Sequence, residues 1–278
     1  MAYTTINKSS LHMNTKLYTG NASAGHAITG VGFQPDWVWI KDRGSNSNHH
    51  LFDAVRGVTK DIISNSSNAQ GTDAQKLTAF GADGFTVGTN GNVNGSSANM
   101  VSWNWKAGTG QGSSNTDGSI NTTYTSVNTT TPTSSLFYVG TADGTNKSSS
   151  NMIAYCFAEK TGYSKFGSYT GNGNADGKFI YTGFKPAFVL FKGSTIAENW
   201  WMFDTKRSES NVANDGLIAS TSNSEYSNNA TFKIDILSNG FKMRSTDSFA
   251  NSSGNTYIFM CFAEAPLVGS NNVPCTAR

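Results

Sequence analysis

Two carboxylate–guanidinium pairs are the charged positions that recur in this sequence. Asp53 precedes Arg56 by three residues, and Asp204 precedes Arg207 by the same distance. Such a pair can line a ligand pocket, or it can form a bidentate contact that fixes a loop beside the core. We favour structural ion pairs at both places. An ion pair that the fold requires must recur in every copy of the fold, whereas a binding site need not recur.

Flat rings stand just before each pair. His49 and His50 precede the first pair, and Trp200 and Trp201 occupy the equivalent places before the second. Metal ligation would require further histidine, cysteine or carboxylate ligands, and the other histidines lie at no recognisable ligand spacing. Replacement of both histidines by tryptophan also argues against a metal. Two interpretations remain for these four residues: packing in the core, or a ligand contact in which a tryptophan stacks on a sugar ring.

No other arrangement of residues predicts catalysis. The sequence contains no Ser/His/Asp elbow, no close carboxylate pair, no phosphate loop and no dinucleotide fingerprint. Its three cysteines predict no disulfide framework. Cys156 and Cys261 fall at the same place in two copies of a repeated strand, so we expect both to pack in the interior, and Cys275 stands alone. We therefore expect a non-enzyme without a cofactor.

The composition is that of a folded β protein with polar loops. Charged residues make up 14% of the chain, and aromatic residues make up 12%, too many for a disordered chain. The net charge is +2 with no basic run, so we expect no nucleic-acid partner. The opening MAYTTINKSS lacks the charged and apolar regions of a secretory signal. No apolar run approaches the about 18 residues of a spanning helix, so we expect no membrane insertion.

One strand sequence is written three times. The copies read NMVSWNWKA (residues 99–107), NMIAYCFAE (151–159) and TYIFMCFAE (256–264). Each follows a Gly/Ser/Asn-rich turn that contains Asn94, Asn146 or Asn251. The distance between turn and strand is the same in all three copies. A unit of this size cannot bury its own apolar surface, so the repetition predicts a stacked β architecture.

The first and third copies close two full repeats. Equivalent strings lie 151 residues apart: YTGN at 18–21 and 169–172, Gly-Phe-x-Pro at 32–35 and 183–186, and the two charged pairs themselves. The offset grows to 156 at Phe85 and Phe241, as expected for insertions in loops. Residues 109–131 are rich in Gly, Ser, Thr and Asn, and the following middle copy lacks the first half of a repeat.

The expected fold is all-β, because strands alternate with turn signals and no long window has helical periodicity. We expect two related β-sandwich (jelly-roll-like) repeats, joined by a Ser/Thr/Gly-rich linker and a partial middle repeat. The expected boundaries are an N-terminal arm (1–14), repeat 1 (15–108), linker and half-repeat (109–164), repeat 2 (165–267) and a C-terminal tail (268–278). We expect the half-repeat to complete a neighbouring sheet as strands, or to form the joint between the repeats.

Several long strings carry a resemblance to a known group of proteins. They are ITGVGFQPDWVWIKDR, LFDAVRG, VSWNWKAG, AYCFAEKTGYSKFGSYTGNGNADGKFIYTGFKPAFVLFK and FAEAPLVGSNNVP. The chain resembles repeat-bearing virion proteins of marine and cyanobacterial bacteriophages, many of them labelled as tail-fibre proteins. The resemblance covers nearly the whole chain, but the middle copy lacks the Gly-Phe-x-Pro strand. It implies a virion structural component with β-sandwich repeats, and it implies no catalytic residue.

The expected function is therefore that of a non-catalytic virion protein, a tail fibre or similar appendage that contacts the host surface. We expect assembly in the host cytoplasm, release by lysis, other virion proteins as partners and a homo-oligomer, since fibre proteins are often trimers. Two alternatives remain open. One is a decoration protein on the capsid surface, and the other is a carbohydrate-binding module or depolymerase with Trp200 and Trp201 at its site. A host-surface glycan or protein is a further expected partner.

Overall fold

The computed structural model describes residues 4–6, 8–108, 133 and 135–268, and this part of the chain is all-β as expected. Its helices are single turns: η1 (Ser9–Leu11), α1 (Gly91–Asn94) and α2 (Asp143–Asn146). Strands dominate because the sequence alternates apolar and polar residues with period two and interrupts each run with turn residues.

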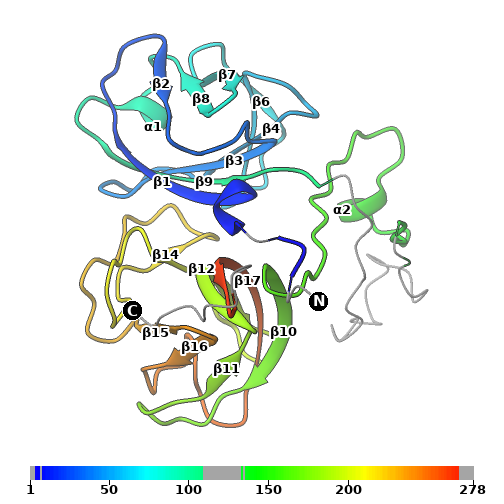
Figure 1. The fold of residues 1–278 in the computed structure, drawn as a ribbon. Coiled ribbons are helices and arrows are strands. Elements are labelled where there is room, and N and C mark those ends of the chain that lie inside the picture. Colours follow the sequence, from blue (N-terminus) through cyan, green and yellow to red (C-terminus); the bar gives the residue numbers. More distant parts are fainter. Residues whose placement is uncertain (1–3, 7, 109–132, 134, 269–278) are drawn as a thin grey trace.

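Repeat 1 is a sandwich of two antiparallel sheets. The larger sheet has the strand order β1-β9-β3-β4-β5-β6 and the smaller sheet has the order β2-β8-β7 (Figure 1). The strands are β1 (Met13–Thr19), β2 (His26–Ile28), β3 (Trp37–Asp42), β4 (His50–Asp53), β5 (Lys60–Ile63), β6 (Gly71–Thr72), β7 (Leu77–Gly81), β8 (Gly84–Val87) and β9 (Asn99–Trp105). Val38 and Phe52 of the large sheet pack on Phe85 and Val87 of the small sheet, and this contact forms the core of the repeat.

Repeat 2 repeats this sandwich. Its larger sheet has the order β10-β17-β12-β13-β14 and its smaller sheet has the order β11-β16-β15. The strands are β10 (Ser164–Thr170), β11 (Phe179–Tyr181), β12 (Phe184–Gly193), β13 (Trp201–Asp204), β14 (Leu217–Ile218), β15 (Ile234–Leu237), β16 (Gly240–Met243) and β17 (Thr256–Pro266). The two repeats therefore confirm the duplication that the 151-residue offset predicts.

The two large sheets pack against each other, so the molecule has four layers (Figure 1). Side chains alternate between two buried faces: in β3, Val38 and Ile40 point into the sandwich core, whereas Trp37 and Trp39 point to the other repeat. Matching residues of repeat 2, among them Phe188 and Leu190, complete this inter-repeat layer. This arrangement explains why every residue of β3 is buried.

Equivalent residues meet each other in the inter-repeat layer. Trp105 ends β9 and Phe262 has the same register in β17, since they pair with Met13 and Ser164 at the equivalent ends of β1 and β10. The Trp105 and Phe262 rings are in contact, with centroids 5.8 Å apart. Contact between equivalent positions is the mark of an isologous interface, so the repeats face each other as the subunits of a two-fold dimer would.

In the two full repeats, the asparagine before the repeated strand (β9 or β17, here called the signature strand) is buried and links the two halves of the repeat by hydrogen bonds. We call this link the asparagine bracket. Asn94 accepts a hydrogen bond from the Asn21 backbone N–H and donates to the Ser23 and Gly88 carbonyls. Asn251 accepts in the same way from the backbone of Asn172. These hydrogen bonds fix the position of the turn. The signature strand begins at the end of that turn, so its distance from the asparagine is the same in both full repeats.

The middle copy departs from expectation. Residues 136–141 and 151–158 form no strand, although the latter have the sequence of the signature strand. A strand needs neighbours, and β9 has β1 and β3 on its two sides, which the half-repeat lacks in the described chain. Residues 135–160 instead run beside the joint of the two repeats (Figure 1), where Tyr155 contacts Trp37 of repeat 1 and Phe157 contacts Phe262 of repeat 2.

Two smaller expectations also need correction. Cys156 is exposed while Cys261 is buried, because only Cys261 lies in a formed strand. The expected N-terminal arm ends too late, since β1 begins at Met13 and η1 precedes it. Thr4 donates a hydrogen bond to the Thr161 carbonyl, so the start of the described chain is tied to the segment before β10. The expected linker at 109–131 and nearly all of the C-terminal tail lie outside the described residues.

Candidate functional site

The Asp204/Arg207 pair is completely buried at the end of β13. Arg207 Nε lies 2.5 Å from Asp204 Oδ2, and both side chains have 0% exposure. Arg207 Nη2 donates to the Met202 carbonyl, and the second Asp204 oxygen accepts the backbone N–H groups of Lys206 and Arg207. The aspartate therefore caps the turn after β13, and the arginine clamps that turn to the strand.

A second carboxylate extends this pair across the joint. Glu225 Oε2 accepts from Arg207 Nη1 at 2.9 Å, and Glu225 Oε1 lies 2.6 Å from Nη2 of Arg43, which follows β3 of repeat 1. Burial alone would raise the pKa of Glu225, but the positive charges of Arg207 and Arg43 hold it below its usual value. The carboxylate is therefore committed to linking the repeats.

The signature strand of repeat 1 reaches the same pair. Trp103 of β9 donates from Nε1 to Asp204 Oδ2 at 3.0 Å. The Arg207 guanidinium carbon lies 5.4 Å from the centre of the same indole, within the range of a cation–π contact. The charged groups of Asp204 and Arg207 are thus bound by other residues of the protein: Glu225 and Trp103.

The Asp53/Arg56 pair has the same geometry in repeat 1. Arg56 Nε lies 2.6 Å from Asp53 Oδ2, and Arg56 Nη2 donates to the Leu51 carbonyl at 3.0 Å, the counterpart of the bond to Met202. Asp53 also caps its turn by accepting the Arg56 backbone N–H. The expected ion pairs are therefore both present, with equivalent hydrogen bonds.

The half-repeat supplies the aromatic donor of this second pair. Tyr155 donates its hydroxyl to Asp53 Oδ2 at 2.9 Å, and its ring stacks on Trp37 with centroids 4.7 Å apart. Tyr155 occupies the place in the repeated sequence that Trp103 occupies in β9. Met260 of β17 also has that place but has no N–H or O–H to donate. The half-repeat therefore supplies, through Tyr155, the hydrogen-bond donor that repeat 2 lacks at this position.

The four ring positions singled out from the sequence are not a ligand surface. His49, His50 and Trp201 are buried, and Trp200 is half-buried and packs on the inter-repeat layer. The ligand-contact interpretation is wrong for the three buried rings, because both faces of β4 and β13 are covered, one by the small sheet of the same repeat and the other by the opposite repeat.

His49 is held neutral in this layer. Trp39 Nε1 donates to His49 Nδ1 at 2.9 Å, so this nitrogen carries no proton. Burial, with a further contribution from the charge of Lys41, lowers the pKa of His49 to about 3.

His50 forms a buried dyad that sequence reasoning did not identify. Its Nδ1 lies 2.6 Å from Asp61 Oδ2, and Lys76 Nζ approaches the same oxygen at 2.8 Å. Burial opposes ionisation of Asp61, but the hydrogen bonds from His50 and Lys76 lower its pKa below the usual value. A histidine–carboxylate pair is a component of acid–base catalysis, yet both side chains are 1% exposed and no substrate can reach them.

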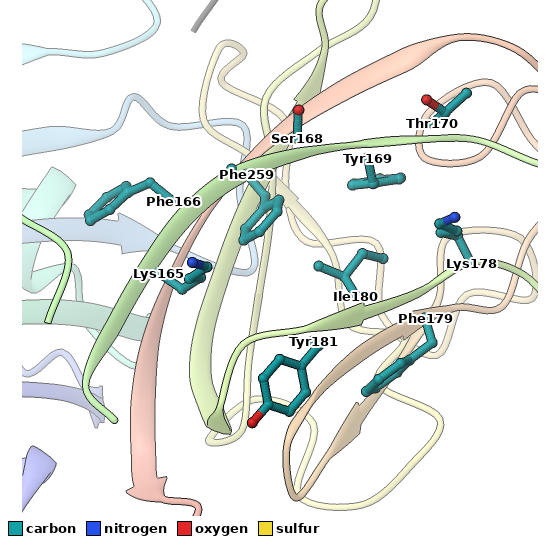
Figure 2. A pocket seen from close by; sticks show the side chains of 11 residues that line it. Lys165, Phe166, Ser168, Tyr169, Thr170, Lys178, Phe179, Ile180, Tyr181 and Phe259 are labelled. Carbon is teal, nitrogen blue, oxygen red and sulfur yellow. The ribbon is translucent and has the colours of Figure 1, made fainter. Parts of the chain in front are cut away.

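The accessible feature of repeat 2 is a cleft between β10 and β11, the open edges of its two sheets (Figure 2). The cleft encloses about 440 Å³. Phe259 of β17 and Ile180 of β11 point into the cleft, whereas the Phe179 and Tyr181 rings, 40% and 56% exposed, point outward from the other side of β11 (Figure 2). Lys178 also lines the cleft and can donate hydrogen bonds.

The two repeats differ at a glycine that lines the cleft. Gly167 of β10 occupies the position that Lys16 has in β1, and a Cβ there would lie 3.1 Å from the Phe259 ring. Lys16 instead reaches towards the segment after β2, where its ammonium group would be 2.9 Å from a Cβ on Gly30. The repeats thus differ here: a side chain spans the two sheets in repeat 1, and the gap is open in repeat 2.

Neither a cluster of metal-binding side chains nor a membrane-spanning helix is found in the part of the chain that the structure describes. No group of three or more His, Cys, Asp or Glu side chains there is arranged to hold a metal ion. None of the described helices has the length and apolar character needed to cross a bilayer.

Comparison with known proteins agrees with the duplicated sandwich. A single family model, described as a domain of unknown function (DUF7483), matches residues 8–131 and again residues 122–266. The chain belongs to the DUF7483 family. It contains this domain twice, which is the internal repeat seen in the structure. No curated protein and no solved structure matches the chain.

Proposed function

We propose that this DUF7483 protein is a non-catalytic structural component of a bacteriophage virion, a tail fibre or a similar appendage that contacts the host surface. The proposal rests on one observation: the recurrent charged residues stabilise the fold rather than face a ligand. Asp53, Arg56, Asp204 and Arg207 bind turns, strands and the neighbouring repeat, and their hydrogen-bonding groups face the protein. A molecule whose ionic groups stabilise stacking is suited to a mechanical role.

The phage assignment is supported by the sequence resemblance given above. Virion proteins assemble inside the host and leave by lysis. The expected partners are other virion proteins and a host-surface molecule.

Location on the particle is the decisive measurement. Antibodies against the protein, bound to purified virions and viewed by immunogold electron microscopy, should label the tail at a fixed distance from the head. Label on the capsid would favour a decoration protein, and absence of label would overturn the virion assignment. Antibodies that bind the tail should also reduce adsorption of the phage to its host.

A second candidate function, binding of a host-surface carbohydrate, is favoured by the cleft between β10 and β11. Beside the cleft, on the outer side of β11, Phe179 and Tyr181 offer exposed rings on which a sugar can stack, and Lys178 offers a cationic donor for an acidic sugar. This cleft replaces Trp200 and Trp201 as the site of the carbohydrate hypothesis.

A glycan array tests this second candidate. The wild-type protein should bind acidic glycans, and Tyr181→Ala should lose at least about tenfold in affinity, the loss of one stacking contact. Gly167→Lys copies the residue of repeat 1 and should block the cleft. Val55→Ala changes an exposed apolar side chain outside the cleft and should have no effect. Binding that survives both cleft variants would exclude the site.

A further inference from the structure

The half-repeat, residues 135–160, has the same turn around α2 that repeat 1 has around α1. Its α2 corresponds to α1, and Ser149 has φ of 58°, the same as Ser97 at the equivalent position. Asn146 Nδ2 donates to the Gly140 carbonyl at 2.8 Å, as Asn94 Nδ2 donates to the Gly88 carbonyl at 2.7 Å. The local fold of the turn is therefore the same as in repeat 1.

The apolar side chains on the two arms of this turn are exposed. Phe137 and Val139 precede α2 and are 52% and 37% exposed, and Met152 follows it and is 51% exposed. Their counterparts in repeat 1, 52 residues earlier, are Phe85, Val87 and Met100, with exposures of 2%, 0% and 0%. The counterparts in repeat 2 are Phe241, Met243 and Tyr257, each fully buried. We call Phe137, Val139 and Met152 the half-repeat face.

The bracket of the half-repeat is also incomplete. In the full repeats, Asn94 and Asn251 bind a turn that follows the first strand and are completely buried. Asn146 is exposed, and its side-chain hydrogen bond to the Gly140 carbonyl stays within its own turn. The half-repeat thus has the apolar side chains and the asparagine of one half of a sandwich, but the other half that would cover them is missing from it.

The other side of the half-repeat is already fixed. Phe157 contacts Trp37 of repeat 1 and Phe262 of repeat 2, with ring centroids 5.4 and 5.5 Å apart. Tyr155 is bound to Asp53. The segment is therefore anchored to the joint and presents its apolar side chains from a fixed base, continuous with the inter-repeat layer.

We propose that the half-repeat face binds the same face of a second copy of this chain, giving a two-fold dimer. The inter-repeat layer shows that this fold buries an apolar face against an equivalent face of its own kind. Residues 133–158 carry only two charges, Asp143 and Lys147, of opposite sign. In a two-fold contact Asp143 can meet the partner's Lys147, so identical faces attract rather than repel. Exposed apolar groups rimmed by polar residues mark such contacts.

Sedimentation velocity and light scattering on the full chain test the proposal. Wild-type protein should have about twice the 29.6 kDa mass of one chain and dissociate on dilution. The double variant Phe137→Ser/Met152→Ser should weaken self-association at least about tenfold. A matched control, Phe179→Ser/Tyr181→Ser, removes two similarly exposed apolar rings from the outer side of β11 and should leave the dimer intact.

Folding can be separated from association because the substituted side chains are exposed. Circular dichroism and the melting temperature of diluted Phe137→Ser/Met152→Ser protein should match those of wild-type monomer. A wild-type chain that remains monomeric at the highest soluble concentration would overturn the proposal, as would a dimer that is insensitive to both half-repeat substitutions. The pairing is independent of the proposed virion role, since it is measured on the isolated protein.

Discussion

Trp103 of repeat 1 donates its indole hydrogen to Asp204 of repeat 2 over 3.0 Å, in a site from which water is excluded. This bond joins the signature strand of one repeat to the capped turn of the other. The equivalent bond in the opposite direction cannot form, because repeat 2 carries Met260 where repeat 1 carries Trp103. Tyr155 of the half-repeat makes that bond to Asp53 instead. The half-repeat thus supplies the donor that repeat 2 does not have at this position.

Loss of the Tyr155 hydroxyl should therefore destabilise the protein without disturbing the stack on Trp37. Tyr155→Phe removes a hydrogen bond to a carboxylate, and we expect the free energy of unfolding to fall by about 1–2 kcal/mol. Urea denaturation followed by tryptophan fluorescence measures the change. Tyr181→Phe alters a 56% exposed tyrosine of β11 and should change stability by less than about 0.5 kcal/mol. Equal effects of the two substitutions would contradict the assignment.

The two arginines of the recurrent pairs should differ in their contribution. Arg207→Met leaves Asp204 and Glu225 as buried carboxylates deprived of their shared partner, and we expect a loss of about 3–5 kcal/mol. Arg56→Met should cost less, about 2 kcal/mol, because Arg56 is 12% exposed and serves one carboxylate. Thermal unfolding of the two variants in parallel measures the difference. The reverse order would show that the link to Glu225 is unimportant.

Much of this architecture could be predicted from the sequence. The all-β class, the duplication and the two ion pairs all follow from local patterns: strands of period two, a fixed offset, and charged residues that recur with it. The run Trp37 to Ile40 is apolar on both faces, and it lies between two buried layers as such a run requires. The strand periodicity and the charged pairs were accessible because they are encoded by residues close together in the chain, and the duplication was accessible because its strings recur at a fixed offset.

The functional interpretation of the rings and of the middle copy could not be obtained in this way. Burial of His49 and Trp201 depends on where β4 and β13 lie in their sheets, and strand order is a property of the whole fold. The sequence of residues 151–158 is that of a strand, but its neighbours are missing. One signal was present and unused: Tyr155 shares the register of Trp103, which marks it as the donor for a second aspartate.

Two equivalent glycines should be intolerant of substitution for the same reason. A Cβ on Gly84 would lie 2.0 Å from the Ile28 carbonyl oxygen, and one on Gly240 would lie 2.0 Å from the Ile180 carbonyl oxygen. Gly240→Ala must therefore separate β11 from β16, and we expect a loss well above about 1 kcal/mol. Gly91→Ala is the matched control, since nothing lies within 4 Å of its Cβ, and it should be neutral or slightly stabilising. Differential scanning calorimetry compares the variants.

Acid sensitivity should begin well above the range in which carboxylates titrate. His49 has an ordinary pKa of 6.5 when unfolded and about 3 when folded, so the unfolded chain binds the extra proton between these values. Its neutral form is required by the Trp39 hydrogen bond, and Lys41, His50 and Arg207 add positive charge around it. Stability is therefore complete above pH 6.5 and falls as the pH decreases, by about 2 kcal/mol at pH 5 from this group alone.

Urea denaturation of wild-type protein and of His49→Gln between pH 8 and pH 5 isolates this contribution. The glutamine oxygen can still accept the Trp39 N–H, but the side chain does not titrate, so the variant should lose about 2 kcal/mol less than wild-type over this range. Glu225 and Asp61 have folded pKa values below their ordinary 4.5 and 3.8, so their stabilisation is lost only at lower pH. Parallel pH profiles for the two proteins would show that His49 becomes protonated without opening the inter-repeat layer, contrary to the packing described.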